Sequence, residues 1–326
     1  MTQHSPYLIV AYYHLVKLDD PVGEVKRHRA FLAKKDVRCR IYLSETGINC
    51  QMSGSVAASE EYMAWISARP EFGGAKFKID PYHTHAFPKV IIKYRRQLVA
   101  FDAEVDFSLR GEHVAPSEWK SMMEKDDGHV ILDIRNDYEW EVGRFDTTER
   151  PPCQTSRGFK EYAKELKDKI DPKKTPVMMY CTGGIRCELF SSLLKADGFE
   201  KVYQLDGGVI NYGHKEGSKH WKGKLFVFDD RMSAPISEES TPIVGSCHFC
   251  KQPNDTYYNC ANMDCNGLFL CCPDCLKEFG GCCQQECMTA ARVRPYHHQD
   301  PHKPFRKWYT YFQDKKSEVR SETESR

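Results

Sequence analysis

One short segment of the chain combines a cysteine, two glycines and an arginine at a spacing that suits thiol chemistry. Residues 180–187 read YCTGGIRC. Gly183 and Gly184 let a tight loop form without steric cost, and such a loop can point several backbone N–H groups at one anion. With Arg186 nearby, these donors should hold the pKa of Cys181 well below the free-thiol value of about 8.5. We therefore predict that Cys181 is a nucleophilic thiolate and that Arg186 is its catalytic partner.

The other loop residues and a second thiol extend this predicted site. Substrate is expected to contact the loop itself, at Thr182, Gly183, Gly184 and Ile185. Cys187 follows six residues after Cys181 and is a candidate resolving thiol for an oxidised sulfur, or else a small packed residue. Cysteine phosphatases place one more residue between cysteine and arginine, so the shorter loop argues against phosphate as substrate.

The elements around the loop should place it at one edge of a parallel sheet. An apolar run over 175–180 predicts a buried strand before Cys181, and residues 188–195 predict a helix after it. Ligands of open α/β sheets bind at the edge where such strands end. Another apolar run, 129–135, ends near the same edge with Asp133 and Arg135. This pair is a candidate for substrate binding, although a salt bridge that braces the fold is the more frequent role.

A second kind of chemistry is indicated by ten of the fifteen cysteines, which lie between residues 247 and 287. Two-residue gaps let both sulfurs of a turn reach one ion. One predicted four-thiolate site comprises Cys247, Cys250, Cys272 and Cys275. A second comprises Cys260, Cys265, Cys287 and either Cys282 or Cys283, with Cys283 preferred. Thiolates favour zinc, in one or two ions, while an iron–sulfur cluster stays open. We expect a structural role because this stretch has few large apolar residues.

Composition limits the classes of protein to which the chain can belong. Its 326 residues suggest two or three domains, and a net charge of +1 means that a nucleic-acid site must be a local basic patch. There is no apolar run near 18 residues and no signal-peptide core, so we expect a cytoplasmic protein without a membrane span. The sequence carries no motif for a nucleotide cofactor.

The order of predicted elements gives three folded domains. Residues 1–107 follow the strand–helix–strand–strand–helix–strand order of a ferredoxin-like α/β domain, with a long last strand over 89–99. Residues 108–236 alternate strands and helices, which predicts a parallel doubly wound sheet. Residues 237–312 form the cysteine-rich module with a basic and aromatic extension. The polar tail, 313–326, is predicted to be disordered.

Two basic stretches are candidates for RNA contact. Lys93, Arg95 and Arg96 interleave with Tyr94 near the end of the first domain. They suit either a strip that contacts RNA or a solvated edge strand protected by charge, and the second is the more frequent use. Cations alternate with aromatic rings over 292–311, which suits unpaired bases or a tail that folds back on the domain.

Several of these stretches together resemble the rhodanese-domain tRNA uridine(34) hydroxylases. The resemblance rests on residues 179–188, on 133–139, on 202–208 and 226–231, and on 259–262 with 281–283. It implies an acylphosphatase-like N-terminal domain, a rhodanese domain and a cysteine-rich C-terminal module. It also implies oxygen-dependent conversion of the wobble uridine to 5-hydroxyuridine, with molecular oxygen as co-substrate, the tRNA anticodon region as partner and Cys181 as catalytic residue. The electron donor is unknown.

Two alternatives stay open at this point. The first is a thiosulfate-type sulfurtransferase that passes sulfane sulfur from a persulfide on Cys181 to a thiol or RNA acceptor. The extra N-terminal domain and the cysteine module argue against it, because a minimal sulfurtransferase needs neither. The second is a non-enzymatic RNA-binding protein, which the intact loop argues against.

Overall fold

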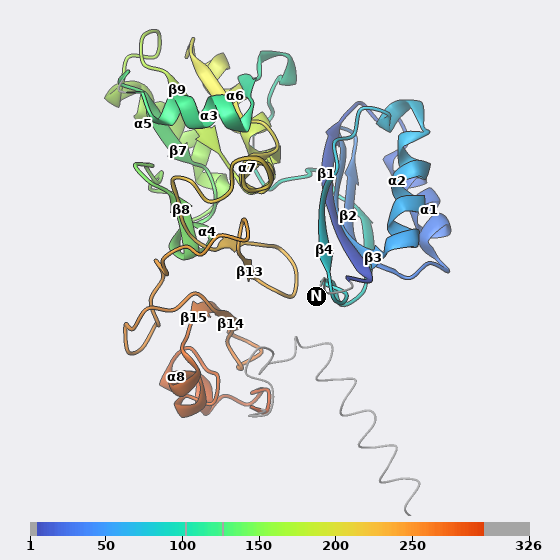
Figure 1. The fold of residues 1–326 in the computed structure, drawn as a ribbon, viewed down its shortest axis with the longest axis vertical. Coiled ribbons are helices and arrows are strands. Elements are labelled where there is room, and N and C mark those ends of the chain that lie inside the picture. The colour runs from blue at the N-terminus through green and yellow to red at the C-terminus, as the bar shows by residue number, and fades with distance from the viewer. Residues whose placement is uncertain (1–4, 102, 126, 297–326) are drawn as a thin grey trace, which may run out of the picture.

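The computed structural model describes residues 5–101, 103–125 and 127–296, which form three folded parts (Figure 1). The N-terminal domain, the central domain and the cysteine-rich module follow one another along the chain, in the order that the sequence predicts. No helix among the described residues has both the length and the apolar character that crossing a membrane requires.

The N-terminal domain is a five-stranded sheet with two helices on one face (Figure 1). Asp20 caps the first helix by accepting a hydrogen bond from the Gly23 N–H at 2.8 Å, and Ser55 caps the second. The strand order is β4-β1-β3-β2-β5, in which β5 runs parallel to β2 and every other pair is antiparallel. The elements in chain order are β1 (Tyr7–Leu15), α1 (Pro21–Leu32), β2 (Val37–Ser44), β3 (Gly47–Ser55), α2 (Val56–Ser67), a 3-10 turn (Pro70–Phe72), β4 (Lys78–Tyr82) and β5 (Val90–Tyr94).

The two faces of this sheet differ in character because side chains alternate along each strand. One face packs against α1 and α2 and holds the domain core, with Val10, Tyr12, Ile41, Ile48 and Met52. The opposite face carries polar and aromatic side chains and is turned toward the central domain (Figure 1). We call this opposite face the roof face; it consists of Ala11, Tyr13, Arg40, Tyr42, Asn49, Gln51 and Lys78.

The last strand of this domain is shorter than predicted. The sequence predicts a strand over 89–99, whereas β5 ends at Tyr94. Its partner strand β2 ends at Ser44, and the last paired residues of the two strands are Leu43 and Tyr94. Arg95 adds one backbone hydrogen bond to the Leu43 carbonyl at 2.8 Å, after which no strand remains to pair with. Arg95 and Arg96 therefore lie beyond the strand.

The central domain has the predicted parallel sheet, in the order β6-β10-β9-β7, with helices on both faces. Helices α5 and α6 enclose one apolar core with Phe159 and Phe190, while α3 and α7 enclose the other with Trp119 and Tyr212. The elements are a 3-10 turn (Phe107–Leu109), β6 (Glu112–Val114), α3 (Pro116–Met123), β7 (Val130–Asp133), α4 (Asp137–Val142), β8 (Gly143–Phe145), a 3-10 turn (Ser156–Gly158), α5 (Phe159–Lys169), β9 (Val177–Tyr180), α6 (Ile185–Ala196), β10 (Val202–Leu205) and α7 (Gly208–Glu216).

Two elements of this domain were not predicted. Strand β6 has only three residues, too few for a periodic pattern to reveal it. Helix α7 begins at Gly208, directly after Gly207, and glycine is a poor helix former. Two adjacent glycines after a strand are typical of a loop. Its tertiary contacts, described below, outweigh the weak local preference.

The chain then forms short antiparallel pairs before the cysteine-rich module. Strand β11 (Trp221–Gly223) pairs with β8, and β12 (Leu225–Phe226) pairs with β13 (Ser233–Ala234). The module contains β14 (Tyr257–Asn259), β15 (Leu268–Leu270), α8 (Pro273–Glu278) and α9 (Gln285–Met288). The predicted disordered tail and most of the basic aromatic extension lie outside the described residues.

Candidate active site and metal centres

The predicted reactive loop lies between the end of β9 and the start of α6. Cys181 follows the last residue of β9, and Gly184 precedes the first residue of α6. Gly184 has a φ of +103°, in the left-handed region that favours glycine. In this conformation its N–H donates a hydrogen bond to the Cys181 Sγ at 3.1 Å. The loop therefore has the predicted form, with a backbone donor directed at the sulfur.

Helix α7 holds the other side of the loop in place. The N–H of Val209 donates to the Cys181 carbonyl at 3.0 Å, and the N–H of Ile210 donates to the Thr182 carbonyl at 3.2 Å. A Cβ added at Gly208 would lie 2.5 Å from the Cys181 carbonyl oxygen, so only glycine allows this approach. Because the carbonyls point at α7, the loop N–H groups are free to face the sulfur.

Cys181 is a thiolate at neutral pH although it is fully buried. Burial alone would raise its pKa. The hydrogen bond from the Cys187 thiol, the charge of Arg186, and the backbone N–H groups of Arg186 and Gly184 together outweigh burial and lower the pKa of Cys181 to about 5. A thiolate of this kind is a nucleophile that can also be oxidised.

Arg186 is paired with a buried carboxylate that the sequence analysis did not identify. Its guanidinium donates to the two carboxylate oxygens of Glu139 at 2.5 and 2.8 Å, and to the Thr182 hydroxyl at 3.2 Å. Burial would raise the pKa of Glu139, but the charge of Arg186 holds it below its usual value. Glu139 is placed by its capping box with Asn136 at the start of α4. Glu139 therefore already balances the charge of Arg186.

The sulfur opens into a cavity of about 300 Å³ that lies between the two domains. The central domain contributes Cys181, Thr182, Gly183, Ile185 and Arg186 to its wall, together with Phe228. The roof face of the N-terminal sheet closes the other side. This volume is at the lower end of the usual range for small-ligand sites, so it suits one nucleotide and excludes a nucleic-acid duplex.

Lys78 is the cation of the roof face that interacts with the Cys181 charge. Its ammonium lies 5.5 Å from the centre of the Tyr13 ring. Burial lowers the pKa of Lys78 to about 8, although the negative charge of Cys181 acts in the opposite direction. The amine is therefore mostly protonated at neutral pH and loses its proton only slightly above it.

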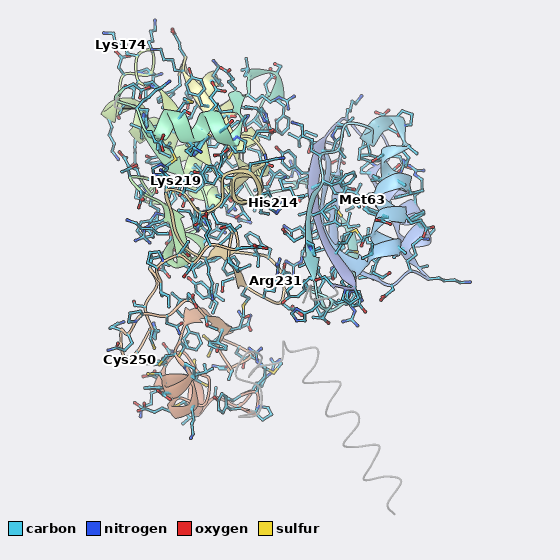
Figure 2. The ribbon with its side chains drawn as sticks, viewed as in Figure 1. Met63, Lys174, His214, Lys219, Arg231 and Cys250 are labelled. Atoms are coloured by element: carbon cyan, nitrogen blue, oxygen red, sulfur yellow. The ribbon has the colours of Figure 1, made fainter. Side chains whose placement is uncertain are left out.

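Polar contacts between the two domains hold the roof face over the loop. The Tyr13 hydroxyl donates to Glu188 at 2.7 Å, and His214 of α7 lies 2.6 Å from Asp80 of β4. The Arg231 guanidinium lies 5.3 Å from the centre of the Tyr82 ring. Figure 2 shows His214 and Arg231 on the side of the central part that faces the N-terminal sheet. The cavity is thus built by both domains.

The remaining residues predicted from the sequence lie in different places. Asp133 and Arg135 are buried and bonded to each other at 2.8 and 2.6 Å, and the Tyr180 hydroxyl donates to Asp133 at 2.7 Å. Neither residue is among those that line the cavity, so their geometry is that of a brace between β7 and β9. This differs from the substrate-binding role for which the sequence made them candidates.

The predicted basic strip is exposed and lies beside the cavity rather than in its wall. Lys93 is in register with Tyr42 of the roof face, and the Arg95 guanidinium lies 5.2 Å from the centre of the Tyr42 ring. Arg96 is exposed in the turn that follows. Since Tyr42 lines the cavity, the positive charges of Lys93 and Arg95 lie near its rim.

Cys187 is fully buried in the first turn of α6. Burial raises its pKa, and the neighbouring Cys181 charge raises it further, so Cys187 stays a protonated thiol. In this state it donates to the Met179 carbonyl, 3.9 Å from its sulfur, and also interacts with the Cys181 sulfur. The contact required of a resolving thiol is therefore present, but the nucleophilic form of Cys187 is suppressed.

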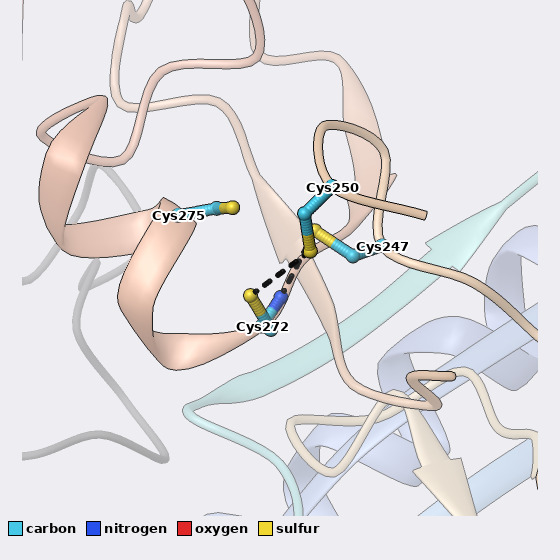
Figure 3. A group of neighbouring side chains, drawn as sticks. All are labelled: Cys247, Cys250, Cys272 and Cys275. Atoms are coloured by element: carbon cyan, nitrogen blue, oxygen red, sulfur yellow. Dashed lines mark hydrogen bonds between the residues drawn. The ribbon is translucent and has the colours of Figure 1, made fainter. Parts of the chain in front are cut away.

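The cysteine-rich module brings eight cysteines into two groups of four. In each group the four Sγ atoms all lie within 4.8 Å of one another. The first group is shown in Figure 3, where the Cys250 and Cys272 sulfurs are 3.7 Å apart. A tetrahedron of sulfurs about 2.3 Å from a zinc ion has edges of about 3.8 Å. The two groups are Cys247, Cys250, Cys272 and Cys275, and Cys260, Cys265, Cys283 and Cys287.

The two groups share one local arrangement. The N–H of Cys272 donates to the Cys247 sulfur and the N–H of Cys283 donates to the Cys260 sulfur, each at 3.4 Å. Each of these donors is the second residue of a Cys-Cys pair, whose first residue is buried outside the group. The structure thus places Cys283, rather than Cys282, in the second group. Four thiolates without a cation would repel one another, so the geometry fits a bound metal.

Several residues of the site could not be identified from their local sequence. Glu139 carries a weak signal, since a capping box predicts a helix start and not a partner for Arg186. Lys78 and the amides Asn49 and Gln51 lie on strands whose alternation predicts a polar face. These residues belong to the site only because that face of the sheet packs over the loop. The local sequence does not predict this packing of one domain on the other.

Three family models match most of the described chain, and similar proteins match more than nine-tenths of the full sequence. Residues 7–98 match the UPF0176 acylphosphatase like domain, residues 115–215 the Rhodanese-like domain and residues 222–288 the Rhodanase C-terminal domain. A tRNA uridine(34) hydroxylase of Protochlamydia amoebophila is 57% identical to this chain over 314 residues, which are 96% of this chain and 98% of that protein. Proteins of the same name from Chlamydia felis and Chlamydia abortus are 49% and 50% identical over 305 residues, covering 93% of this chain and 94% and 93% of theirs.

Proposed function

This chain belongs to the tRNA uridine(34) hydroxylase family, and on that premise we propose that it converts uridine 34 of tRNA to 5-hydroxyuridine. Molecular oxygen is the proposed co-substrate. The observation that carries the proposal is a buried thiolate, Cys181, in a cavity that has room for one nucleotide. The wobble base lies in a single-stranded loop, from which one nucleotide can be turned into such a cavity.

Cys181 is the proposed catalytic residue, and Arg186 acts through it. The Arg186 guanidinium is bonded to Glu139, so we assign it the role of holding the thiolate rather than binding a phosphate. Thr182, Gly183, Gly184 and Ile185 form the loop wall that the base would contact. A persulfide or sulfenate on Cys181 is the proposed oxygen-handling species.

Cys187 and the basic strip have supporting roles in this proposal. As a resolving thiol, Cys187 would condense with a sulfenic acid on Cys181 to form a disulfide and release water. An external thiol reductant would then reduce this disulfide and return Cys181 to the thiolate. Lys93, Arg95 and Arg96 are proposed to contact the phosphates of the anticodon loop at the cavity rim. Phosphate contacts of this kind position an RNA without reading its sequence.

Both cysteine groups are proposed to bind structural zinc. All four positions of each group are filled by cysteine, which leaves no open coordination site for a reaction. We expect two zinc ions per chain by elemental analysis of the purified protein. Iron with inorganic sulfide at these sites would contradict the assignment.

We further propose that the domain boundaries lie at 1–107, 108–236 and 237–312, and that the enzyme acts in the cytoplasm together with its tRNA. Transfer of sulfur to a thiol acceptor is not favoured, because the relatives that match nearly the whole chain are named hydroxylases.

Complementation of a bacterial strain that lacks 5-hydroxyuridine-34 derivatives tests the activity. The wild-type chain should restore these nucleosides in tRNA digests analysed by mass spectrometry. Cys181→Ser should not restore them, although the protein is made and folded. Thiosulfate:cyanide activity without any change in the tRNA would favour the sulfurtransferase instead.

A further inference from the structure

The roof face carries two side-chain amides that face the cavity. Asn49 and Gln51 lie on β3 and both line the cavity. The residues between and beside them, Ile48, Cys50 and Met52, are fully buried in the N-terminal domain. The alternation of the strand therefore directs Asn49 and Gln51 away from the core and toward the loop that holds Cys181.

Neither amide has a side-chain hydrogen bond within the part of the chain that the structure describes. An amide offers two N–H donors and one carbonyl acceptor. Three other polar groups around the reactive loop are engaged: Tyr13 donates to Glu188, Arg40 donates to the Phe228 carbonyl at 3.3 Å, and Arg186 donates to Glu139. Asn49 and Gln51 thus supply both donors and acceptors that are available to a bound molecule.

The neighbours of these amides are arranged in two rows across the sheet. Asn49 is paired with Tyr13 on one side and with Tyr42 on the other. Gln51 is paired with Ala11 and Arg40, and Ala11 is in turn paired with Lys78. The small Ala11 side chain leaves space beside Gln51, in a row that has Lys78 at one end and Arg40 at the other. One row thus offers aromatic rings and the other offers a gap lined by positive charge.

This set of groups matches the chemistry of a nucleotide that carries uracil. The Watson–Crick edge of uracil presents an acceptor, a donor and an acceptor, and it carries no charge. One amide satisfies the central N–H and one carbonyl, and the second amide donates to the other carbonyl. Neighbouring residues on one face of a strand are about 7 Å apart, which lets the two amides approach the edge from both ends. A cation on each side of the gap suits the flanking phosphates.

Building on the proposed function, we propose that Asn49 and Gln51 hydrogen-bond the Watson–Crick edge of the target uracil in the cavity. The N-terminal domain then selects the base, while the rhodanese loop supplies the sulfur. The loop alone could not do so, because its backbone N–H groups are directed at Cys181 and its carbonyls at α7. The roof face is thus the specificity element of the enzyme.

Binding is measured in the Cys181→Ala background, which separates recognition from chemistry. The probes are two anticodon stem-loop RNAs, one with uridine at position 34 and one with the ribonucleoside of pyrimidin-2-one, which lacks the 4-oxygen and the N3–H. We expect the protein to bind the uridine RNA roughly 10- to 100-fold more tightly. With Asn49→Leu and Gln51→Met together, the two RNAs should bind equally. Gln97→Met removes an exposed amide outside the cavity wall and should leave the preference intact.

Three outcomes would overturn the inference: no preference in the parent protein, a full preference in the double variant, or its loss in Gln97→Met. Alkylation of Cys181 in the matching Cys181-containing proteins checks that the cavity is intact, since its pH midpoint should not move. If the double variant fails to fold, Gln51→Glu alone should reduce the preference, because it removes the donors and keeps the shape. Hydroxylation of the uridine RNA by the parent enzyme is scored separately, so a failed activity is distinguished from a failed recognition.

Discussion

Replacing Arg186 by methionine separates two roles of this residue, that of a charge near the sulfur and that of a partner for a buried carboxylate. Glu139 is fully buried and receives two hydrogen bonds from Arg186, at 2.5 and 2.8 Å. Removing one partner of such a pair costs about 3–5 kcal/mol, because the remaining charge stays buried without compensation. For a domain of this size, we expect the unfolding midpoint to fall on the order of 10 °C.

The same substitution should also change the titration of Cys181. Its pKa of about 5 depends in part on the charge of Arg186. An opposite charge at close range shifts a pKa by roughly 1–3 units, so the midpoint should move toward neutral pH. Alkylation of the Cys181 peptide by iodoacetamide, followed by mass spectrometry as a function of pH, measures this midpoint directly.

A second substitution distinguishes the two roles. Glu139→Gln in the Arg186→Met background removes the uncompensated charge, so stability should largely return while the pKa of Cys181 stays high. Arg150→Met is the control, because Arg150 forms a surface pair with Asp137 at 3.4 Å and lies 5.5 Å from the centre of the Trp140 ring, with no buried carboxylate as partner. Loss of the surface pair should cost about 0–1 kcal/mol. If the double variant recovered the low pKa as well, Arg186 would act only through Glu139. An unchanged unfolding midpoint in Arg186→Met would refute the buried-pair argument itself.

Three further predictions concern the loop, the roof face and the metal groups. Gly208→Ala should abolish activity by displacing the loop, since its Cβ would lie 2.5 Å from the Cys181 carbonyl oxygen. Gly183→Ala should fold normally, because its Cβ would meet no atom within 4 Å, and should weaken RNA binding, because it would take up space in the cavity that Gly183 lines. Hydroxylation assays, thermal unfolding and RNA titration check the pair. The rate of hydroxylation should rise with pH through about 5, where the catalytic thiolate forms, and fall above about 8, where Lys78 loses its proton. Lys78→Arg should extend the alkaline limb of this pH profile. An unchanged alkaline limb would exclude Lys78 as the group that causes it. Cys272→Ser should release one metal ion per chain and lower the stability of the C-terminal module, whereas Cys271→Ser, outside the groups of four, should keep both ions by elemental analysis.

The sequence was sufficient for those parts of the protein in which local pattern and chemistry coincide. The strand before Cys181, the glycine at a positive φ and the helix after it form one continuous segment, so their arrangement is predictable from spacing. The first group of four cysteines follows from its two-residue gaps. The second follows from the cysteines that remain in the module, and the fold places Cys283 rather than Cys282 in it. The brace between Asp133 and Arg135 was among the predicted alternatives.

The parts that could not be predicted depend on contacts between distant segments. Glu139 lies 47 residues before Arg186, and no periodicity links the two. Helix α7 exists despite its two initial glycines because Val209 and Ile210 donate to the loop carbonyls. The length of β5 is set by the end of β2, its partner in the sheet. In each case a hydrogen bond between distant segments decides the local structure, and a local sequence pattern does not predict such a bond.

The docking of the N-terminal sheet explains how a common kind of loop can serve a different reaction. An isolated loop of this form leaves its sulfur open to water and to any small thiol. Here the roof face covers the sulfur, and the contacts of Tyr13 with Glu188 and of Asp80 with His214 hold it there. Cys181 is fully buried under this cover, and limited contact with bulk water strengthens electrostatic interactions around the sulfur and protects an oxidised sulfur from side reactions. Access is then limited to a group that can be turned out of a single strand, such as one nucleotide. We therefore expect Asp80→Leu, which weakens the docking, to raise the reaction of Cys181 with free thiol reagents while it lowers hydroxylation of RNA; a parallel change in both rates would contradict this account.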